Sequence, residues 1–364
     1  MAEPGDGTSD DHRGLTEADY DWSSRHIIAA RLVEALVPPG GRVLDIGGAA
    51  GVAVDLLPHH DVTVADVIGG GVDVIASGTD LPFRDRSFAA AISLDVLEHV
   101  DSQQKPAMVS EAVRVADAVV LAGPYDDAGV REAEAEQREG FEVMYGYEHP
   151  WLSEHFELGL PALNGVVEQL SAAGLQTGVF GSNPLRLWSE LRFGTHVAQL
   201  FDIDRETWPL RRYLVETFLD GGDAAPPSYR HFVVGARNAD VAGAIDLVRP
   251  GADAAAADAT LEKARHDTLR IIGAAGANIP ELQVHAHNLE AGMAELHQEL
   301  DHRLEVIDDL TEEAERRLNI INEVTEKADA LETRLHAIEE AVQRDRVTRS
   351  IVDRRLKRPA RPSE

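Results

Sequence analysis

The sequence predicts an α/β fold with a mainly parallel sheet, followed by a long α-helical coiled coil. Three observations lead to this prediction. Short apolar runs alternate with amphipathic stretches over residues 19–239, a glycine-rich turn follows the first apolar run, and heptad spacing occupies the C-terminal part of the chain. Strands that alternate with helices form parallel sheets that are covered on both faces.

Composition restricts the classes of function. The chain has 364 residues, a hydrophobic content of 44%, a formal net charge of −30 and no cysteine. This length predicts one large domain plus an accessory segment. The negative charge argues against a nucleic-acid partner, and the lack of cysteine excludes disulfides, a thiolate zinc site and a cysteine nucleophile.

The N-terminal region divides into a polar segment and a helix. Residues 1–18 are acidic and have almost nothing to bury, so we expect disorder and no secretory signal. Apolar residues at helical spacing predict a helix over Tyr20–Val37, which ends before the prolines and glycines of 38–41. No run of 18 apolar residues is present, and we expect a cytoplasmic protein.

The glycine turn is the most informative motif. A strand-like run, Arg42–Ile46, contains Asp45 and is followed by Gly47, Gly48 and Gly51. Glycine lets the backbone approach a ligand closely, because it has no Cβ. Counting the dinucleotide fingerprint from Gly47 places other residues at its second and third glycine positions, so that fingerprint does not fit.

A second strand ends in an acid. Residues 61–67 alternate in a strand-like manner, and Asp66 lies 21 positions after Asp45. A carboxylate at this distance suits a ribose, because it can accept two hydrogen bonds from a vicinal diol. The alternative for Asp66 is a solvated loop acid.

Two further blocks carry a family resemblance. Residues 76–83 include the segment Leu81–Phe83, and residues 87–100 form a buried strand that ends in Leu97–His99. Together with the D-x-G-x-x-x-G spacing of 45–51, they resemble class I S-adenosylmethionine (SAM) methyltransferases of the type 11-like group. The resemblance implies a Rossmann-like seven-stranded methyltransferase sheet whose last strand is antiparallel.

The resemblance also implies SAM as the cofactor and a set of residues around it. In order along the chain, these are Asp45, Gly47, Gly48 and Gly51 at the methionine end, Asp66 at the ribose, Ser77 and Gly78 at the adenine, and Leu94 and Asp95 at the end of the fourth strand. Three positions depart from the family pattern, namely Ala49, Ser77 and Ala89, where many relatives have Gly, Asp and Asp.

The remaining elements complete the expected domain. Further strands are predicted near 89–94, 118–122 and 174–180, and helices over 104–115, 132–139, 163–173 and 184–219. The last strand, Ser228–Ala236, is expected to run antiparallel and to close the sheet, so that the domain ends near residue 239.

Aromatic residues and histidines gather in the segment 141–161, which follows the fifth strand. Open α/β sheets bind ligands on that side. Aromatic faces with carboxylates and histidines suit a sugar, and a packed lid without chemistry is the alternative.

If the acceptor is a hydroxyl, a base must take its proton, and histidine suits this role near neutral pH. The candidates are His99, His149 and His155, which Glu148 and Glu154 could assist. A structural hydrogen bond is the alternative for His99. No spacing demands a metal, so no metal ligand is assigned.

The C-terminal part predicts assembly. Residues 240–258 are rich in Ala and Asp and are expected to be a linker, and 259–345 form a helical coiled coil whose apolar steps are mostly three and four. A homo-oligomer is the simplest way to cover that seam, and folding back onto the catalytic domain is the alternative. The basic tail, 346–364, is either solvated or in contact with anionic lipid or an acidic partner.

Three hypotheses for function follow. The first is a SAM-dependent O-methyltransferase that acts on a glycan or glycosylated intermediate and is oligomerised or positioned by its coiled coil. The second is a small-molecule methyltransferase for a quinone or natural product. The third is a coiled-coil scaffold with a catalytically weak methyltransferase-like domain.

Overall fold

The computed structural model describes residues 20–48, 52–203, 207–219, 222–249 and 253–276, together with six single residues beyond them. The chain divides into two compact units, Met1–Pro280 and Glu281–Glu364. In the second unit the six described residues, which lie between 302 and 340, all have helical backbone. The predicted disordered N-terminus, the basic tail and most of the predicted coiled coil lie outside the described residues.

The first unit is built on a seven-stranded sheet with the order β3-β2-β1-β4-β5-β7-β6. Its strands are β1 (Arg42–Ile46), β2 (Asp61–Asp66), β3 (Val74–Ile75), β4 (Phe88–Leu94), β5 (Ala116–Pro124), β6 (Gln176–Pro184) and β7 (Ser228–Ala236). The pairs among β1 to β5 are parallel, whereas β7 runs antiparallel to both β5 and β6. The predicted α/β class and antiparallel last strand are therefore confirmed.

The sequence predicted that the last strand, β7, closes the sheet, and this prediction is wrong. β7 lies between β5 and β6, and β6 occupies the edge. The physical reason is visible in burial, because the apolar run Phe232–Val234 of β7 is fully buried, whereas β6 is half-exposed over most of its length. A strand that is apolar on both faces must be covered by other elements on both faces, and the interior of the sheet is better covered than its edge.

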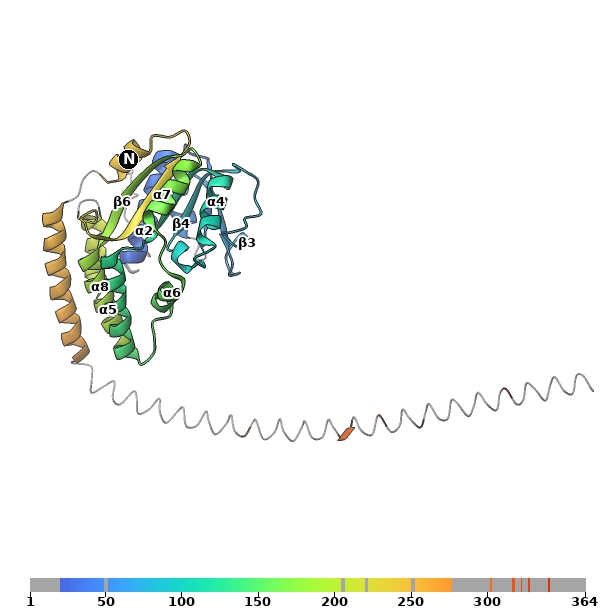
Figure 1. Cartoon of the computed structure of the whole chain (residues 1–364). Coiled ribbons are helices and arrows are strands. Elements are labelled where there is room, and N and C mark those ends of the chain that lie inside the picture. The colour runs from blue at the N-terminus through green and yellow to red at the C-terminus, as the bar shows by residue number, and fades with distance from the viewer. Residues whose placement is uncertain are drawn as a thin grey trace, which may run out of the picture. The chain divides into compact units, whose positions relative to one another are not determined.

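Helices cover both faces of the sheet (Figure 1). In chain order they are α2 (Tyr20–Leu36), α3 (Val52–Leu56), α4 (Lys105–Val115), α5 (Ala128–Tyr145), α6 (Pro150–Leu158), α7 (Leu163–Ala172), α8 (Leu185–Leu200), α9 (Trp208–Tyr213) and α10 (Val241–Val248), with a 3-10 turn η1 (Leu97–His99) and a π-helical turn η3 (Leu214–Phe218).

Two cores lie on opposite faces, because side chains alternate along each strand. Val43 and Val120 pack with α2 and α10 in one core, whereas Leu44 and Val119 pack with α4 and α7 in the other. All four side chains are fully buried. Every central strand is thus fixed from both sides, and its carboxyl end is held in place.

The predicted linker over 240–258 is wrong, because helices occupy 241–248 and 254–258. Helix α10 begins at its cap Asp240, whose carboxylate accepts a hydrogen bond from the Gly243 backbone N–H at 3.0 Å. Val241, Ala244 and Val248 are buried in the core beside α2. These residues have helical spacing, which the Ala/Asp-rich composition of the segment obscured.

A further helix over 254–276 also packs onto this unit. Ala257 and Ala264 join the core that contains α2, and Ile271 joins a smaller cluster with Val197 of α8. The first compact unit therefore extends well past residue 239.

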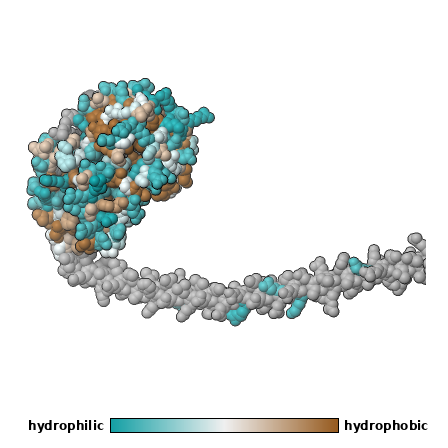
Figure 2. Space-filling view, viewed as in Figure 1, coloured by the Kyte–Doolittle hydropathy of each residue, from teal (hydrophilic) through white to brown (hydrophobic). Residues whose placement is uncertain are grey.

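The surface agrees with the acidic composition. Figure 2 shows a visible face of this unit that is largely hydrophilic, broken by smaller hydrophobic patches. Within the described part of the chain, none of the helices has the length and apolar character needed to cross a bilayer.

Candidate functional site

The glycine turn follows β1 at the carboxyl edge of the sheet. Ile46 pairs with Ala65, so β1 and β2 end side by side, and the Gly47 N–H donates to the Ala65 carbonyl at 2.8 Å. Gly47 has a φ of +82°, and a Cβ on it would lie 2.4 Å from a methyl carbon of Val96. Both the conformation and the space require glycine here.

Gly48 is required for a different reason. A Cβ at Gly48 would lie 2.0 Å from Oδ2 of Asp45, which is itself buried. Burial, and then the charge of Asp66, raise the pKa of Asp45 to about 7. Residues 49–51 lie outside the described residues, so the predicted cofactor contact of Gly51 stays a prediction.

Asp66 ends β2 and is half-buried. Its Oδ1 accepts a hydrogen bond from the Ile68 backbone N–H at 2.8 Å, which holds the carboxylate at the turn. It lines a pocket of about 540 Å³ at the carboxyl edge of the sheet, a volume typical of small-molecule sites.

Ser77, Gly78 and Leu94 are not among the residues that line this pocket. The Ser77 hydroxyl forms a hydrogen bond with that of Thr79 at 2.8 Å. A Cβ on Gly78 would lie 3.0 Å from the side chain of Ile46, and Leu94 is buried in the core. Asp45 and Gly48, which lie on either side of Gly47 in the chain, also do not line the pocket.

Asp95 lines the pocket, and its carboxylate is paired with two arginines. It has a φ of +53°, and its carboxylate accepts hydrogen bonds from Arg230 Nε at 2.8 Å and from Arg25 at 2.6 Å. Arg230 is completely buried and also donates to Asp21 at 2.8 Å. Burial alone would raise the pKa of Asp95, but Arg230 and Arg25 outweigh it and lower that pKa.

Helix α2 lies against the site. Asp21 and Arg25 of this helix line the pocket. Tyr20 instead points into the core, where its hydroxyl donates to Asp223 at 2.6 Å.

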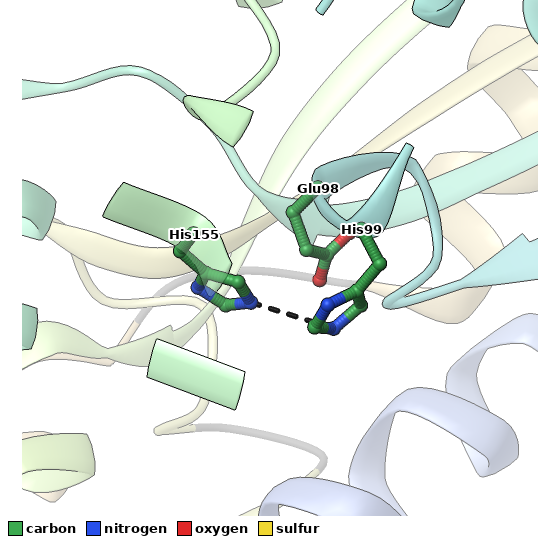
Figure 3. Close-up of side chains that lie close together, drawn as sticks. All are labelled: Glu98, His99 and His155. Carbon is green, nitrogen blue, oxygen red and sulfur yellow. Dashed lines mark hydrogen bonds between the residues drawn. The ribbon is translucent and has the colours of Figure 1, made fainter. Parts of the chain in front are cut away.

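All three predicted catalytic histidines line the pocket. His99 lies on η1, directly after β4, and His155 lies on α6, 56 residues later in the chain. Their Nε2 atoms face each other at 3.4 Å (Figure 3). Burial, and then His155, lower the pKa of His99, while Glu154 opposes this shift.

Each of these two imidazoles has a carboxylate behind it. Glu154 accepts from Nδ1 of His99 at 2.7 Å, and Glu134 of α5 accepts from Nδ1 of His155 at 2.9 Å. Glu134 is buried and also accepts from the Tyr229 hydroxyl at 2.9 Å. Because an ionised carboxylate only accepts, Nδ1 is the donor in both pairs, and the two Nε2 atoms are left to face each other.

Glu98 completes the cluster. Its side chain is buried, its Oε2 has no hydrogen-bond partner in the described structure, and its pKa is raised well above the usual value, first by burial and then by Asp95. Figure 3 shows the Glu98 carboxylate next to the His99 ring.

His149 has a different position from the other two histidines. It caps α6, and its Nδ1 accepts from the Leu152 N–H at 3.3 Å. Burial, and then the neighbouring Arg192, lower the pKa of His149 to about 4. It is a neutral capping residue at neutral pH.

Sequence reasoning missed several residues that line the pocket or bind the residues that line it. Glu98 was visible only as part of the Leu97–His99 motif, and Glu134 lay in a stretch that looked merely charged. Arg230 and Tyr229 belong to a strand whose apolar run predicted only a core role. Their signal in the sequence is a polar residue inside an otherwise buried strand, because buried polar groups need partners.

Comparisons with known proteins agree with this geometry. Residues 44–118 match a family model described as a methyltransferase domain. No curated protein matches the chain.

Three similar solved structures are distant from this chain in sequence. A possible histamine N-methyltransferase from Thermotoga maritima is 16% identical and has a TM-score of 0.36, over 59% of this chain and 91% of that one. The plantazolicin methyltransferase BpumL, solved with SAH, is 10% identical with a TM-score of 0.36, over 64% and 92% of the two chains. A putative methyltransferase from Haloferax volcanii, solved with the activator Trm112, is 17% identical with a TM-score of 0.37, over 62% and 95%. Likenesses this distant carry no inference about the acceptor.

The residues present fit the cofactor that this domain uses. The matched segment runs from β1 into β5 and includes the glycine turn, Asp66 and the end of β4. Gly47 leaves open backbone at the pocket, beside the carboxylate of Asp66. Residues 44–118 therefore belong to a methyltransferase domain, and SAM is its cofactor.

Proposed function

We propose that this enzyme methylates a hydroxyl oxygen of a glycan or glycosylated acceptor. The observation that carries the proposal is one pocket that joins Gly47 and Asp66 to the carboxylate-backed pair His99 and His155. A methyl donor on one side and a proton acceptor on the other are what transfer to a hydroxyl needs.

On the cofactor side, Gly47 and Asp66 are the proposed contacts to the methionine end and the ribose of SAM. Asp45 and Gly48 support the turn from behind. Asp95 is proposed to act through Arg25 and Arg230, which hold its carboxylate. Ser77 and Gly78 are proposed to support the adenine end of the site, and Leu94 the end of β4, from outside the pocket lining.

On the acceptor side, His99 is the proposed base of the metal-free enzyme. SAM supplies an electrophilic methyl group on a sulfonium. The acceptor hydroxyl, as it takes up that methyl group, would give its proton to Nε2 of His99. Glu154 stabilises the imidazolium that forms, because it accepts the hydrogen bond from Nδ1.

The glycan class rests on the residues around that base. Trp151 is 66% exposed and lines the pocket, together with Glu154 and Arg192. An exposed indole offers a face for a sugar ring, and charged side chains offer partners for its hydroxyls. A quinone would instead need a pocket without these charges.

The cofactor role is tested by calorimetric binding of S-adenosylhomocysteine. Asp66→Ala is expected to weaken binding at least tenfold, about 1.4 kcal/mol. Asp61→Ala is the matched control, because Asp61 lies on the same strand at the opposite edge of the sheet and its side chain is 71% exposed. Equal binding by the two variants would remove Asp66 from the site.

The acceptor role is tested by methyl transfer to a panel of sugars, glycans and quinones. His99→Gln is expected to lower the rate by a factor of about 10² to 10⁴, whereas His59→Gln, at an exposed position, leaves it unchanged. Transfer to quinones alone would replace the glycan proposal with the small-molecule hypothesis.

We also propose that the seam within residues 281–345 pairs with a second copy of the chain. The support is the heptad spacing of the sequence, since an isolated helix of this length would expose its apolar stripe. Sedimentation of the full chain is expected to give a dimer or higher oligomer that Leu304→Glu and Leu331→Glu together dissociate. A monomeric wild-type chain would rule the proposal out.

A further inference from the structure

The cluster of Glu98, His99 and His155 has the arrangement of a metal site. One ligand atom from each residue lies within 4.8 Å of the other two. The two Nε2 atoms are 3.4 Å apart, and two nitrogens bound to one tetrahedral ion at about 2.0–2.1 Å are about 3.3 Å apart.

The orientation of the imidazoles supports a bound cation. Each Nδ1 is held by a carboxylate, Glu154 for His99 and Glu134 for His155, so each Nε2 points its lone pair at the other. Two lone pairs at this distance repel unless a proton or a cation lies between them. Carboxylates that orient metal-binding histidines in this way are the usual outer partners of zinc ligands.

Glu98 provides the third ligand. Its buried Oε2 has no hydrogen-bond partner within the described chain, although buried carboxylate oxygens normally have one. The carboxylate needs to move by roughly 1–2 Å to complete a tetrahedral set. A bound ion would account for this oxygen and for the facing imidazoles together.

We propose that Glu98, His99 and His155 bind one divalent transition-metal ion at the acceptor side of the pocket. Two imidazoles and one carboxylate select zinc-like ions over Mg²⁺ and Ca²⁺, which prefer oxygen ligands. Three protein ligands leave a fourth position open, as in catalytic rather than structural zinc sites.

The consequence for catalysis rests on the proposed function. An imidazole that shares its Nε2 lone pair with an ion cannot also take a proton. In the loaded enzyme the ion would therefore lower the pKa of an acceptor hydroxyl in place of the histidine base. The acceptor class stays the same, and the activating group changes.

The test measures metal binding alone, without SAM or acceptor. Full-length protein stripped with a chelator is titrated with Zn²⁺, and with Mg²⁺ for comparison, by calorimetry in the presence of a competing chelator. We expect the wild type to bind one equivalent of Zn²⁺ tightly and no Mg²⁺, and His99→Gln and His155→Gln to lose that equivalent.

Two further variants make the result specific. His149 lines the same pocket but lies outside the cluster, and asparagine at this position keeps an oxygen that can cap α6. The His149→Asn variant is therefore expected to bind Zn²⁺ like the wild type. Glu154→Gln, at a side chain that is 43% exposed, is expected to weaken Zn²⁺ binding 10- to 100-fold without loss of the fold.

Equal Zn²⁺ stoichiometry and affinity in the wild type, His99→Gln and His155→Gln would overturn the proposal and assign a shared proton to the two Nε2 atoms. If either histidine variant fails to fold, Glu154→Gln decides, because unchanged affinity in that variant would equally overturn it. A failure of methyl transfer with Zn²⁺ binding intact would count against the proposed function alone.

Discussion

The two sides of the pocket are built in different ways. The proposed cofactor side is local, since Asp45, Gly47 and Asp66 come from 22 consecutive residues and from two adjacent parallel strands. The acceptor side gathers Glu98 and Tyr229, which are separated by more than 130 positions in the chain. A turn whose backbone must approach a ligand requires particular residues at consecutive positions. A cluster of side chains requires only that distant segments meet in space, so it leaves no local pattern in the sequence.

The largest expected effect breaks the ion-pair network that joins the two sides. Arg230→Met would leave Asp21 and Asp95 without their buried partner and is expected to lower the free energy of unfolding by about 3–5 kcal/mol. Urea denaturation measures this.

The control for this experiment is Arg131→Met. Arg131 pairs with Asp126 where both side chains are about half exposed, so the loss is expected to be at most about 1 kcal/mol. Similar losses in Arg230→Met and Arg131→Met would mean that the network does not stabilise the site.

The next effect sharpens the contrast on the cofactor side. Gly48→Ala would place a Cβ 2.0 Å from the Asp45 carboxylate and is expected to cost about 1–3 kcal/mol of stability. It is also expected to weaken S-adenosylhomocysteine binding at least tenfold. Thermal unfolding and calorimetry measure the two quantities.

Gly140→Ala is the matched substitution, because Gly140 lies within α5 with nothing near its missing Cβ. It is expected to leave binding unchanged and to raise stability by up to about 1 kcal/mol. Weakened binding in this variant as well would show that the Gly48 effect is not local.

A similar effect tests the acceptor side. Tyr229→Phe removes one donor to buried Glu134 but keeps the ring, which stacks on Trp188 at 3.8 Å between centroids. We expect a loss of about 1–3 kcal/mol in urea denaturation, because a charged acceptor loses a hydrogen bond. Tyr147→Phe, at a 57% exposed side chain, is expected to change stability by less than about 0.5 kcal/mol. Equal free energies of unfolding for the two variants would show that the hydrogen bond from Tyr229 to Glu134 does not stabilise the fold.

The last prediction concerns pH. The pKa of His149 is lowered to about 4 in the folded protein, so the unfolded chain binds the extra proton first as pH falls. The stabilisation from the neutral ring is complete above about pH 6.5 and is lost between about pH 6.5 and 4. His149→Asn is expected to show a shallower fall of stability over that range in denaturant titrations. Parallel curves for the two proteins would contradict the shifted pKa.

Most of the fold and part of the site could be predicted. Six of the seven strands, the helix α2 and the candidate residues Gly47 and Asp66 follow from alternation, glycine spacing and an acid at a strand end, whereas the short β3 was not predicted. The histidines could be named, because their chemistry is rare, but not paired. Residues 240–258 were misassigned as a linker, because small alanine side chains gave a weak apolar pattern.

The sequence by itself determined the α/β class, the parallel strands and the glycine turn, because these depend on local periodicity and on backbone that only glycine allows. Only the tertiary structure decided that β7 lies inside the sheet, that Arg230 pairs with Asp21 and Asp95, and that Glu134 and Glu154 orient His155 and His99. Such contacts depend on how buried polar groups find partners across distant elements, and no local spacing records that choice.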